Sequence, residues 1–216
     1  MKKLRALLKA SHFGPTLLVT TIAFGFANYY WWEGPAFVIA FGVFTGQLVV
    51  GWSNDLYDYE DDHRHNRLNK PLVAKTISEK TLQKSLRFML PFSFIANLLG
   101  PLGIKGGMVY MLGIACGVGY NLYFKFSPLS PLPYAIAFAA LPSCIAISKE
   151  ITPPTWMWLG GALLGMAAHF LNVIKDMKED QISEIGGLPQ RLGTTKSIIC
   201  ALILITLGVL TILIAR

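Results

Sequence analysis

Charged residues are scarce in this sequence. Only 14% of its 216 residues are Asp, Glu, Lys or Arg, whereas 53% are hydrophobic. A soluble domain usually carries about 25% charged residues, so the deficit argues against a water-soluble globule, a disordered chain and a nucleic-acid-binding arm. The mean hydropathy of +0.49 indicates a protein of the membrane instead.

Cysteine is also scarce. Cys116, Cys144 and Cys200 all lie in apolar runs, and their number is odd. Neither a disulfide framework nor the spacing of metal ligands is visible. We therefore expect the three cysteines to be small buried apolar residues.

Long apolar runs are what the sequence has in abundance. A helix needs about 20 apolar residues to cross a bilayer core of about 30 Å. Seven stretches fit this length, and they predict an all-α, polytopic membrane bundle of about seven transmembrane helices, formed as a single domain over residues 1–216. The stretches are 13–32, 35–53, 86–104, 107–124, 131–148, 155–174 and 197–215.

The basic residues predict the orientation of these spans. With the N-terminus in the cytoplasm, 16 of the 19 Lys and Arg residues fall in inner segments. Cytoplasmic loops of membrane proteins carry such an excess. The net charge of +7 is thus explained by orientation, without a nucleic-acid partner. We expect an integral protein of the cytoplasmic membrane.

The acidic residues gather in two short stretches at the inner ends of the second and sixth spans, NDLYDYEDD (54–62) and NVIKDMKED (172–180). If both stretches continue as helix, each set of aspartates shares one helical face. Like charges on one face repel, and a divalent cation would remove that penalty. Carboxylates and Asn carbonyls are the ligands that Mg²⁺ prefers. The aspartates concerned are Asp55, Asp58 and Asp62 in the first stretch and Asp176 and Asp180 in the second.

The two stretches are in register. Asn54 and Asn172, Asp58 and Asp176, Asp62 and Asp180, and Pro71 and Pro189 are each separated by 118 residues. This offset predicts an internal duplication around 54–71 and 172–189, with the two copies facing each other.

Cations accompany the acids. Arg67 and Lys70 follow the first stretch, and Lys125 closes the fourth span. Metal-binding carboxylates beside Arg and Lys predict a site for a polyanion such as diphosphate. At the mouth of an apolar bundle this implies an amphiphilic substrate. Loss of diphosphate from an allylic carbon would leave a carbocation, which aromatic faces could stabilise. The candidate aromatic residues are Phe44, Trp52, Tyr57, Tyr120 and Tyr123.

These motifs resemble the UbiA superfamily of intramembrane prenyltransferases. The family's Asn-Asp-x-x-Asp-x-x-x-Asp signature corresponds to residues 54–62, and its Asp-x-x-x-Asp signature to residues 176–180. The flanks NRLNKPLVAKTIS (66–78), YNLYFKFSPLS (120–130) and GGLPQRLG (186–193) are similar too. Members typically have nine spans, against the seven found here, and many have Arg-Pro where this chain has Lys70-Pro71.

The resemblance implies helices around a central cavity that is open to the cytoplasmic side, where the active site would lie. It implies Mg²⁺-dependent transfer of a prenyl group from a prenyl diphosphate to an aromatic or other lipid-precursor acceptor. The metal ligands would be Asn54, Asp58, Asp176 and Asp180, with Asp55 and Asp62 as supporting catalytic residues. The diphosphate would be held by Arg67, Lys70 and Lys125. Ser11 and His12 could add polar groups to the cavity, and a second copy of the chain, in a homo-oligomer, could complete its wall.

Three other functions predict different features in the sequence. Phosphatidyl transfer would call for Gly directly after the second Asp of a D-x-x-D motif, where this sequence has Tyr59. A transporter that uses the carboxylates for cations would place acids deep in the bilayer or on both sides, but the outer loops carry only Glu33 and Glu150. An inactive or partner-dependent relative of the family remains open.

Overall fold

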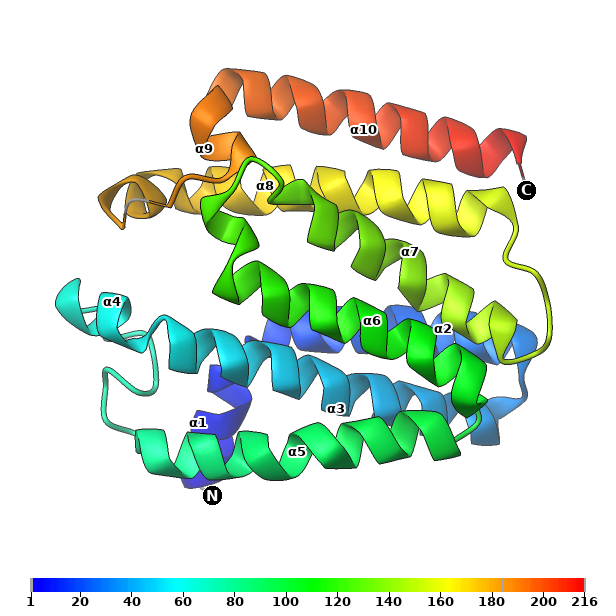
Figure 1. Cartoon of the computed structure of the whole chain (residues 1–216), viewed down its shortest axis with the longest axis horizontal. Helices are drawn as coiled ribbons and strands as arrows, with labels where there is room; N and C mark the ends of the chain where they lie inside the picture. Colours follow the sequence, from blue (N-terminus) through cyan, green and yellow to red (C-terminus); the bar gives the residue numbers. More distant parts are fainter. Residues whose placement is uncertain (1, 184, 216) are drawn as a thin grey trace. The chain divides into compact units, whose positions relative to one another are not determined.

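The computed structural model describes residues 2–183 and 185–215, and all regular structure in these residues is helical. Figure 1 shows the helices in chain order. The chain divides within α6 (Gly103–Leu122) into two compact units, residues 1–107 and 108–216. Each predicted span falls on a helix, so the all-helical fold class is confirmed.

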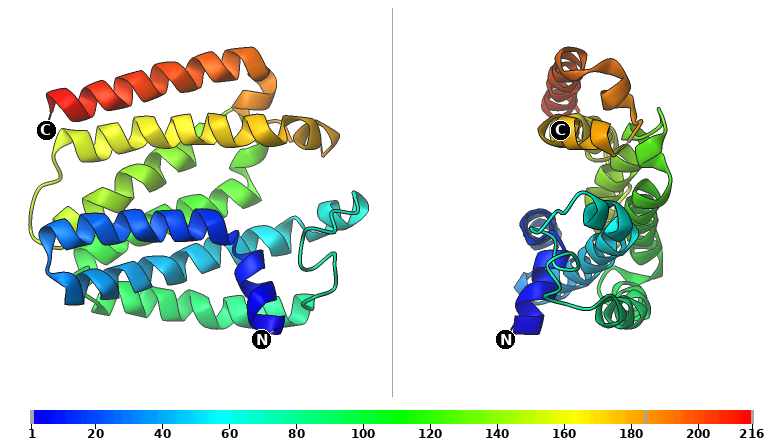
Figure 2. Two further views of the ribbon diagram at one scale, coloured as in Figure 1. Left: turned by 180° about the vertical axis from the view of Figure 1, so that it is seen from behind. Right: turned by 90° about the vertical axis from the view of Figure 1, so that its left-hand side faces the viewer.

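The first unit is built around α3 (Glu33–Tyr57), with α2 (Phe13–Tyr30) and α5 (Glu79–Leu99) packed along it (Figure 1). The short α1 (Lys2–Ala10) precedes α2, and the two helices meet at a bend of 73°. Figure 2 shows this bend from behind. A brief α4 (Tyr59–Arg64) follows α3. The motif-bearing helix of this unit is therefore its central helix.

A small apolar core holds together the end of this unit at which α3 ends. Ala10 of α1, Trp52 of α3 and Leu82 of α5 are buried in it, together with Leu72 and Ile77 of the segment that joins α4 to α5. The Trp52 indole N–H donates to the backbone oxygen of Leu7, 2.9 Å away. Trp52 is thus a packing residue that ties α1 to α3, and the joining segment is anchored beside it.

The second unit repeats this plan. It contains the rest of α6, a single 3₁₀ turn η1 (Phe124–Phe126), α7 (Pro131–Ile147), the π-helical turn η2 (Trp156–Gly160), α8 (Gly161–Ile182), α9 (Leu188–Leu192) and α10 (Thr194–Ile214). The motif-bearing α8 packs between α7 and α10 (Figure 1). Gly165 permits the close approach of α7, because a Cβ there would lie 2.4 Å from the Tyr134 backbone oxygen.

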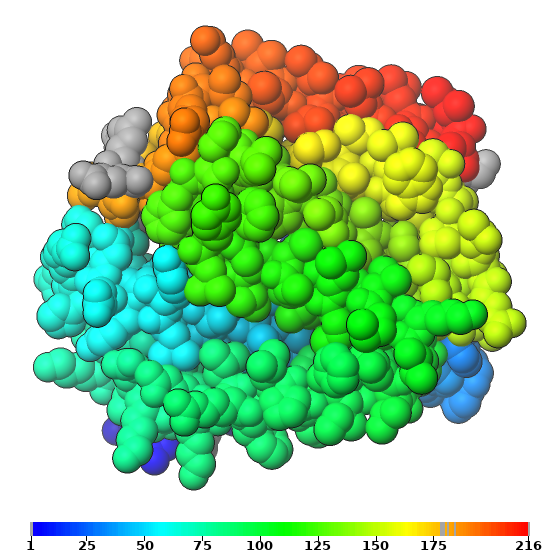
Figure 3. All heavy atoms as spheres, in the orientation of Figure 1, coloured from blue at the N-terminus to red at the C-terminus, as the bar shows by residue number. Residues whose placement is uncertain are grey.

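Among the described residues, three helical segments are long and apolar enough to cross a membrane: Glu33–Tyr57, Trp156–Met177 and Thr194–Ile214. The bent pair α1–α2 makes a fourth if it forms one span. Many apolar side chains of α10, drawn orange to red in Figure 3, lie exposed on its surface, as lipid contact requires. The helical membrane bundle is supported, and the count of seven spans stays a prediction.

Candidate active site

The first motif lies where α3 ends. Asn54 and Asp55 belong to the last turn of α3, and the helix bends at Asp58 before α4 begins at Tyr59. The prediction of an uninterrupted helix over 54–62 is therefore wrong. Two helix-type hydrogen bonds nevertheless bridge the bend, from Asp58 N to Asn54 O (2.9 Å) and from Asp62 N to Asp58 O (2.8 Å). The helix therefore changes direction at Asp58, but the aspartates stay on neighbouring turns.

Lys70 joins the first and last aspartates of this motif. Its Nζ donates to Asp55 Oδ1 at 2.9 Å and lies 3.7 Å from Asp62 Oδ2. Both carboxylates are only 2% exposed, and the Lys70 side chain is 18% exposed. Two buried acids therefore share one cation, which compensates much of the cost of burying their charges.

Arg67 completes the network. Its guanidinium donates to Asp62 Oδ1 at 2.7 Å and lies 3.6 Å from Asp61 Oδ2. The chain folds back at this point, because Asn66 adopts a left-handed backbone conformation and Arg67 N donates to Asp62 O. Arg67 and Lys70, predicted to hold a diphosphate, are thus placed beside the motif by its own aspartates.

The surroundings of Lys70 and Asp62 shift the pKa of both groups. Burial by itself lowers the pKa of Lys70, but the carboxylates of Asp55, Asp62 and Asp58 outweigh it, so that the pKa is raised above its ordinary value. The pKa of Asp62 is also raised, first by burial and then by the nearby Asp58 carboxylate, although Lys70 and Arg67 oppose both. Lys70 is therefore held firmly in its charged form.

His12 reaches the same cluster from the corner between α1 and α2. Its ring Nε2 lies 3.4 Å from Asp55 Oδ1, from Asn54 Nδ2 and from Lys70 Nζ. The residue adopts a left-handed backbone conformation, with φ 53°, where the chain turns between the helices. Ser11 is buried at this corner, and its hydroxyl donates to Leu8 O. The structure thus brings His12, but not the Ser11 hydroxyl, to the motif.

The second motif lies on the last turns of α8, which continues as helix through Asp176 and Asp180 as predicted. Asn172 and Asp176 are exposed, and Asp180 is partly buried. The Tyr134 hydroxyl of α7 forms a hydrogen bond with the Asn172 side chain. Asp180 Oδ2 accepts a hydrogen bond from Gln190 Nε2 at 2.7 Å. The side chains of Tyr134 and Gln190 therefore contact this motif.

Lys125 lies in the turn η1 of the second unit and is only 6% exposed. Its Nζ lies 5.2 Å from the centre of the Phe126 ring. The backbone oxygen of Lys125 would be 3.1 Å from a Cβ at Gly187. The segments 120–130 and 186–193, which the sequence singled out separately, therefore lie against each other.

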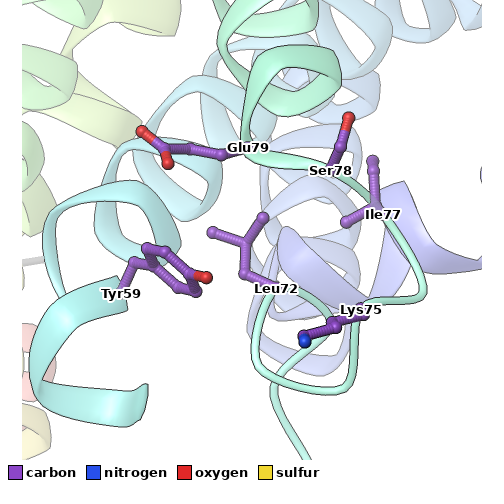
Figure 4. A pocket seen from close by; sticks show the side chains of 6 residues that line it. All are labelled: Tyr59, Leu72, Lys75, Ile77, Ser78 and Glu79. Atoms are coloured by element: carbon purple, nitrogen blue, oxygen red, sulfur yellow. The ribbon is translucent and has the colours of Figure 1, made fainter. Parts of the chain in front are cut away.

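Two pockets lie beside the first motif but are not lined by its Asn and Asp residues. One, of about 330 Å³, is shown in Figure 4 and is lined by Tyr59, Leu72, Lys75, Ile77, Ser78 and Glu79. The other, of about 410 Å³, is lined by Tyr59, Glu60, His63 and Arg64. The predicted central cavity stays a prediction.

The match to a family model decides which family the sequence represents. Residues 16–216 match the model of the UbiA prenyltransferase family. The chain belongs to the UbiA prenyltransferase family. No curated protein matches it in sequence.

Solved structures agree with this UbiA assignment. A UbiA homologue from Archaeoglobus fulgidus bound to GPP and Mg²⁺ is 16% identical, with a TM-score of 0.78 over 95% of this chain and 75% of that one. The same homologue bound to DMAPP and Mg²⁺ gives a TM-score of 0.76 at 16% identity over 94% and 75%. A structure described for digeranylgeranylglyceryl phosphate synthase gives 0.75 at 17% identity over 97% and 76%. Identities this low establish the UbiA fold alone.

The residue types predicted to bind the metal suit a hard cation such as Mg²⁺. Asn54, Asp58, Asp176 and Asp180 offer only oxygen ligands, and Asp55 Oδ2 is a buried oxygen without a hydrogen-bond partner. Within residues 2–183 and 185–215, no group of three or more His, Cys, Asp or Glu side chains could hold a metal by itself. This is compatible with Mg²⁺, which is commonly bound by one or two carboxylates together with waters and substrate phosphates.

Sequence reasoning missed two residues that contact the second motif or support it. Gln190 bonds to Asp180 from ten positions along the chain, and Ser130 bonds to the backbone of Leu188. Neither spacing matches a helical period, so no periodic pattern could have indicated these contacts. Both residues lie within segments that resemble the family, 120–130 and 186–193, and this was the one available signal.

Proposed function

We propose that this protein catalyses Mg²⁺-dependent transfer of a prenyl group from a prenyl diphosphate to an aromatic or other lipid-precursor acceptor within the membrane. The observation that carries the proposal is a pair of Asn- and Asp-bearing motifs, one at the end of each unit's central helix, in a chain of the UbiA prenyltransferase family. Relatives of the same fold bind DMAPP or GPP together with Mg²⁺.

Asn54, Asp58, Asp176 and Asp180 are the proposed metal ligands. When bound, Mg²⁺ would neutralise diphosphate oxygens and so make diphosphate a better leaving group. Arg67, Lys70 and Lys125 would bind the remaining phosphate oxygens, with the planar Arg67 guanidinium suited to a bidentate contact.

Asp55 and Asp62 have a supporting role in this proposal. Each holds a cation, Lys70 in the first case and chiefly Arg67 in the second. Holding these flexible side chains in place before substrate arrives lowers the entropic cost of binding the diphosphate. They are positioning residues for Arg67 and Lys70 rather than groups that must touch the substrate.

The reaction breaks the bond between the allylic carbon and the diphosphate oxygen, and the electron pair leaves with diphosphate. A nucleophilic carbon or oxygen of the acceptor then bonds to the allylic carbon and loses a proton. The exposed ring of Tyr123 and the ring of Tyr120 remain candidates to stabilise positive charge on the prenyl group. Trp52 is buried and is a poorer candidate.

The active site is proposed to face the cytoplasm, because the predicted inner segments carry 16 of 19 basic residues. The hydrocarbon chain of the donor would lie among the spans, in contact with membrane lipid. A homo-oligomer is a further proposal, tested by the mass of the purified protein in detergent.

A product search tests this function. Membranes that contain the protein are incubated with Mg²⁺, prenyl diphosphates from geranyl to polyprenyl and a panel of acceptors, and the lipids are analysed by mass spectrometry. We expect an acceptor whose mass is increased by one prenyl chain, absent from membranes with Asp176→Asn. Mg²⁺-dependent cation flux without any prenylated product would instead support the transporter.

A further inference from the structure

The segment that follows α8 turns back onto the second motif. Ile185 N donates to Asp180 O at 2.9 Å, and the Gln190 side chain then donates from Nε2 to Asp180 Oδ2 at 2.7 Å. A carboxylate on the last turn of a helix can adopt several rotamers. A donor fixed on a separate segment favours one of them.

Ser130 fixes the segment that carries this donor. Its Oγ accepts a hydrogen bond from Leu188 N at 2.9 Å and forms a second with His169 Nε2 at 3.0 Å. Ser130 is fully buried and His169 is 1% exposed. Ser130 therefore connects the start of α7, the middle of α8 and the start of α9, two residues from Gln190.

The fit around Gln190 leaves little room for other arrangements. A Cβ at Gly187 would lie 2.7 Å from Gln190 Oε1 and 2.9 Å from Ser130 Oγ. Pro189 is buried, and its oxygen accepts from Ser197 Oγ at 3.1 Å. The backbone that leads into Gln190 is thus held, and the amide nitrogen of Gln190 faces Asp180.

The last aspartate of each motif accepts a side-chain hydrogen bond from a residue that follows it in the chain. Asp62 is bonded to the cation Arg67, whereas Asp180 is bonded to the neutral amide of Gln190. An amide donor orients a carboxylate without neutralising its charge. Second-layer donors of this kind tune metal ligands, and their loss typically weakens metal binding or activity by about 10–100-fold.

We propose that Gln190 is a positioning residue that orients the Asp180 carboxylate for metal binding, and that Ser130 acts on Asp180 through Gln190. The inference rests on the proposed Mg²⁺ site. It concerns how the second motif is prepared for the metal and applies whatever the acceptor.

The test follows metal binding in the purified full-length protein without a prenyl substrate. The rise in melting temperature in detergent is measured against Mg²⁺ concentration with inorganic diphosphate present. Gln190→Met keeps the side-chain length and removes the donor, while Gln190→Asn keeps an amide but shortens its reach. Gln83→Met is the matched control, because Gln83 Nε2 also donates to a carboxylate, Glu79 Oε1, at 2.7 Å, far from either motif in the sequence.

We expect both Gln190 variants to need about tenfold more Mg²⁺ for half of the rise, and Gln83→Met to match the wild type. Ser130→Ala should shift the midpoint in the same direction, and combining it with Gln190→Met should add little, because the two act in series. The melting temperature without Mg²⁺ reports folding separately.

Two outcomes oppose the inference in distinguishable ways. If the wild type responds to Mg²⁺ and the Gln190 variants respond at the same concentration, the positioning role is wrong while the proposed function stands. If the wild type itself shows no Mg²⁺-dependent rise, the proposed metal site fails, and the inference fails with it.

Discussion

Lys70 lies between two buried aspartates of the first motif, and its replacement by Met gives a quantitative prediction. Lys70→Met keeps most of the aliphatic stem and removes the ammonium group that donates to Asp55 Oδ1 at 2.9 Å. The other oxygen of Asp55 is already buried without a hydrogen-bond partner. The variant therefore leaves a carboxylate that is 2% exposed, with the His12 ring nitrogen at 3.4 Å as its nearest remaining polar contact.

Breaking a buried ion pair by removing one partner costs about 3–5 kcal/mol. We expect the lower end, about 3 kcal/mol, because the Lys70 side chain is 18% exposed and His12 remains. Replacing Asp55 as well removes the stranded charge. In an Asp55→Asn background, Lys70→Met should therefore cost about 2 kcal/mol less.

The assay is unfolding in mixed detergent micelles, followed by Trp fluorescence. It compares the wild type, Lys70→Met, Asp55→Asn and the double variant. Lys80→Met, at an exposed position on α5, is the control and should change the free energy of unfolding by less than about 0.5 kcal/mol. Two results would refute the reasoning, because each means that the ion pair contributes nothing to stability. The first is a loss of unfolding free energy in Lys70→Met no larger than in Lys80→Met. The second is an equal loss from Lys70→Met whether position 55 is Asp or Asn.

Two further predictions concern the same unit. The pKa of Lys70 in the folded protein is raised above its ordinary value of 10.5. Its contribution to stability is therefore complete below pH 10.5 and is lost as the pH rises through the folded pKa. A pH series of melting temperatures should show this alkaline loss in the wild type and much less of it in Lys70→Met. Gly51→Ala should destabilise the protein by about 1–3 kcal/mol, because its Cβ would lie 2.5 Å from the backbone oxygen of Ser11. Gly25→Ala, where the space is open, should be neutral or stabilise by up to about 1 kcal/mol; equal melting temperatures for the two variants would contradict the close contact of α3 with the α1–α2 corner.

Much of the helical architecture could be predicted, because apolar runs of about 20 residues can satisfy their backbone groups only as helices in a membrane. The run at 35–53 is the middle of α3 (Glu33–Tyr57), and the run at 197–215 covers most of α10 (Thr194–Ile214). The 73° turn at His12 and the bend at Asp58 could not be predicted. Both depend on contacts with other segments, such as the packing of α1 against Trp52.

The candidate site could also be predicted only in part. The identity of the acids followed from their clustering, since like charges on one surface need a reason to gather. Which cation holds which acid did not follow, because Lys70 and Asp55 are 15 residues apart and meet only when the segment after α4 folds onto the apolar core. The Gln190–Asp180 bond likewise depends on a turn that Ser130 fixes through the backbone of Leu188. The duplication at an offset of 118 residues stays a prediction.

The most direct test of the central claim is diphosphate release by the purified protein. With Mg²⁺, an acceptor and a panel of prenyl diphosphates, we predict release that EDTA stops and that Asp58→Asn and Asp176→Asn each reduce by at least about 100-fold. Glu60→Gln, which removes an exposed carboxylate two residues from Asp58, should retain wild-type release. Wild-type release by both aspartate variants would contradict the assignment of the two motifs as the metal site.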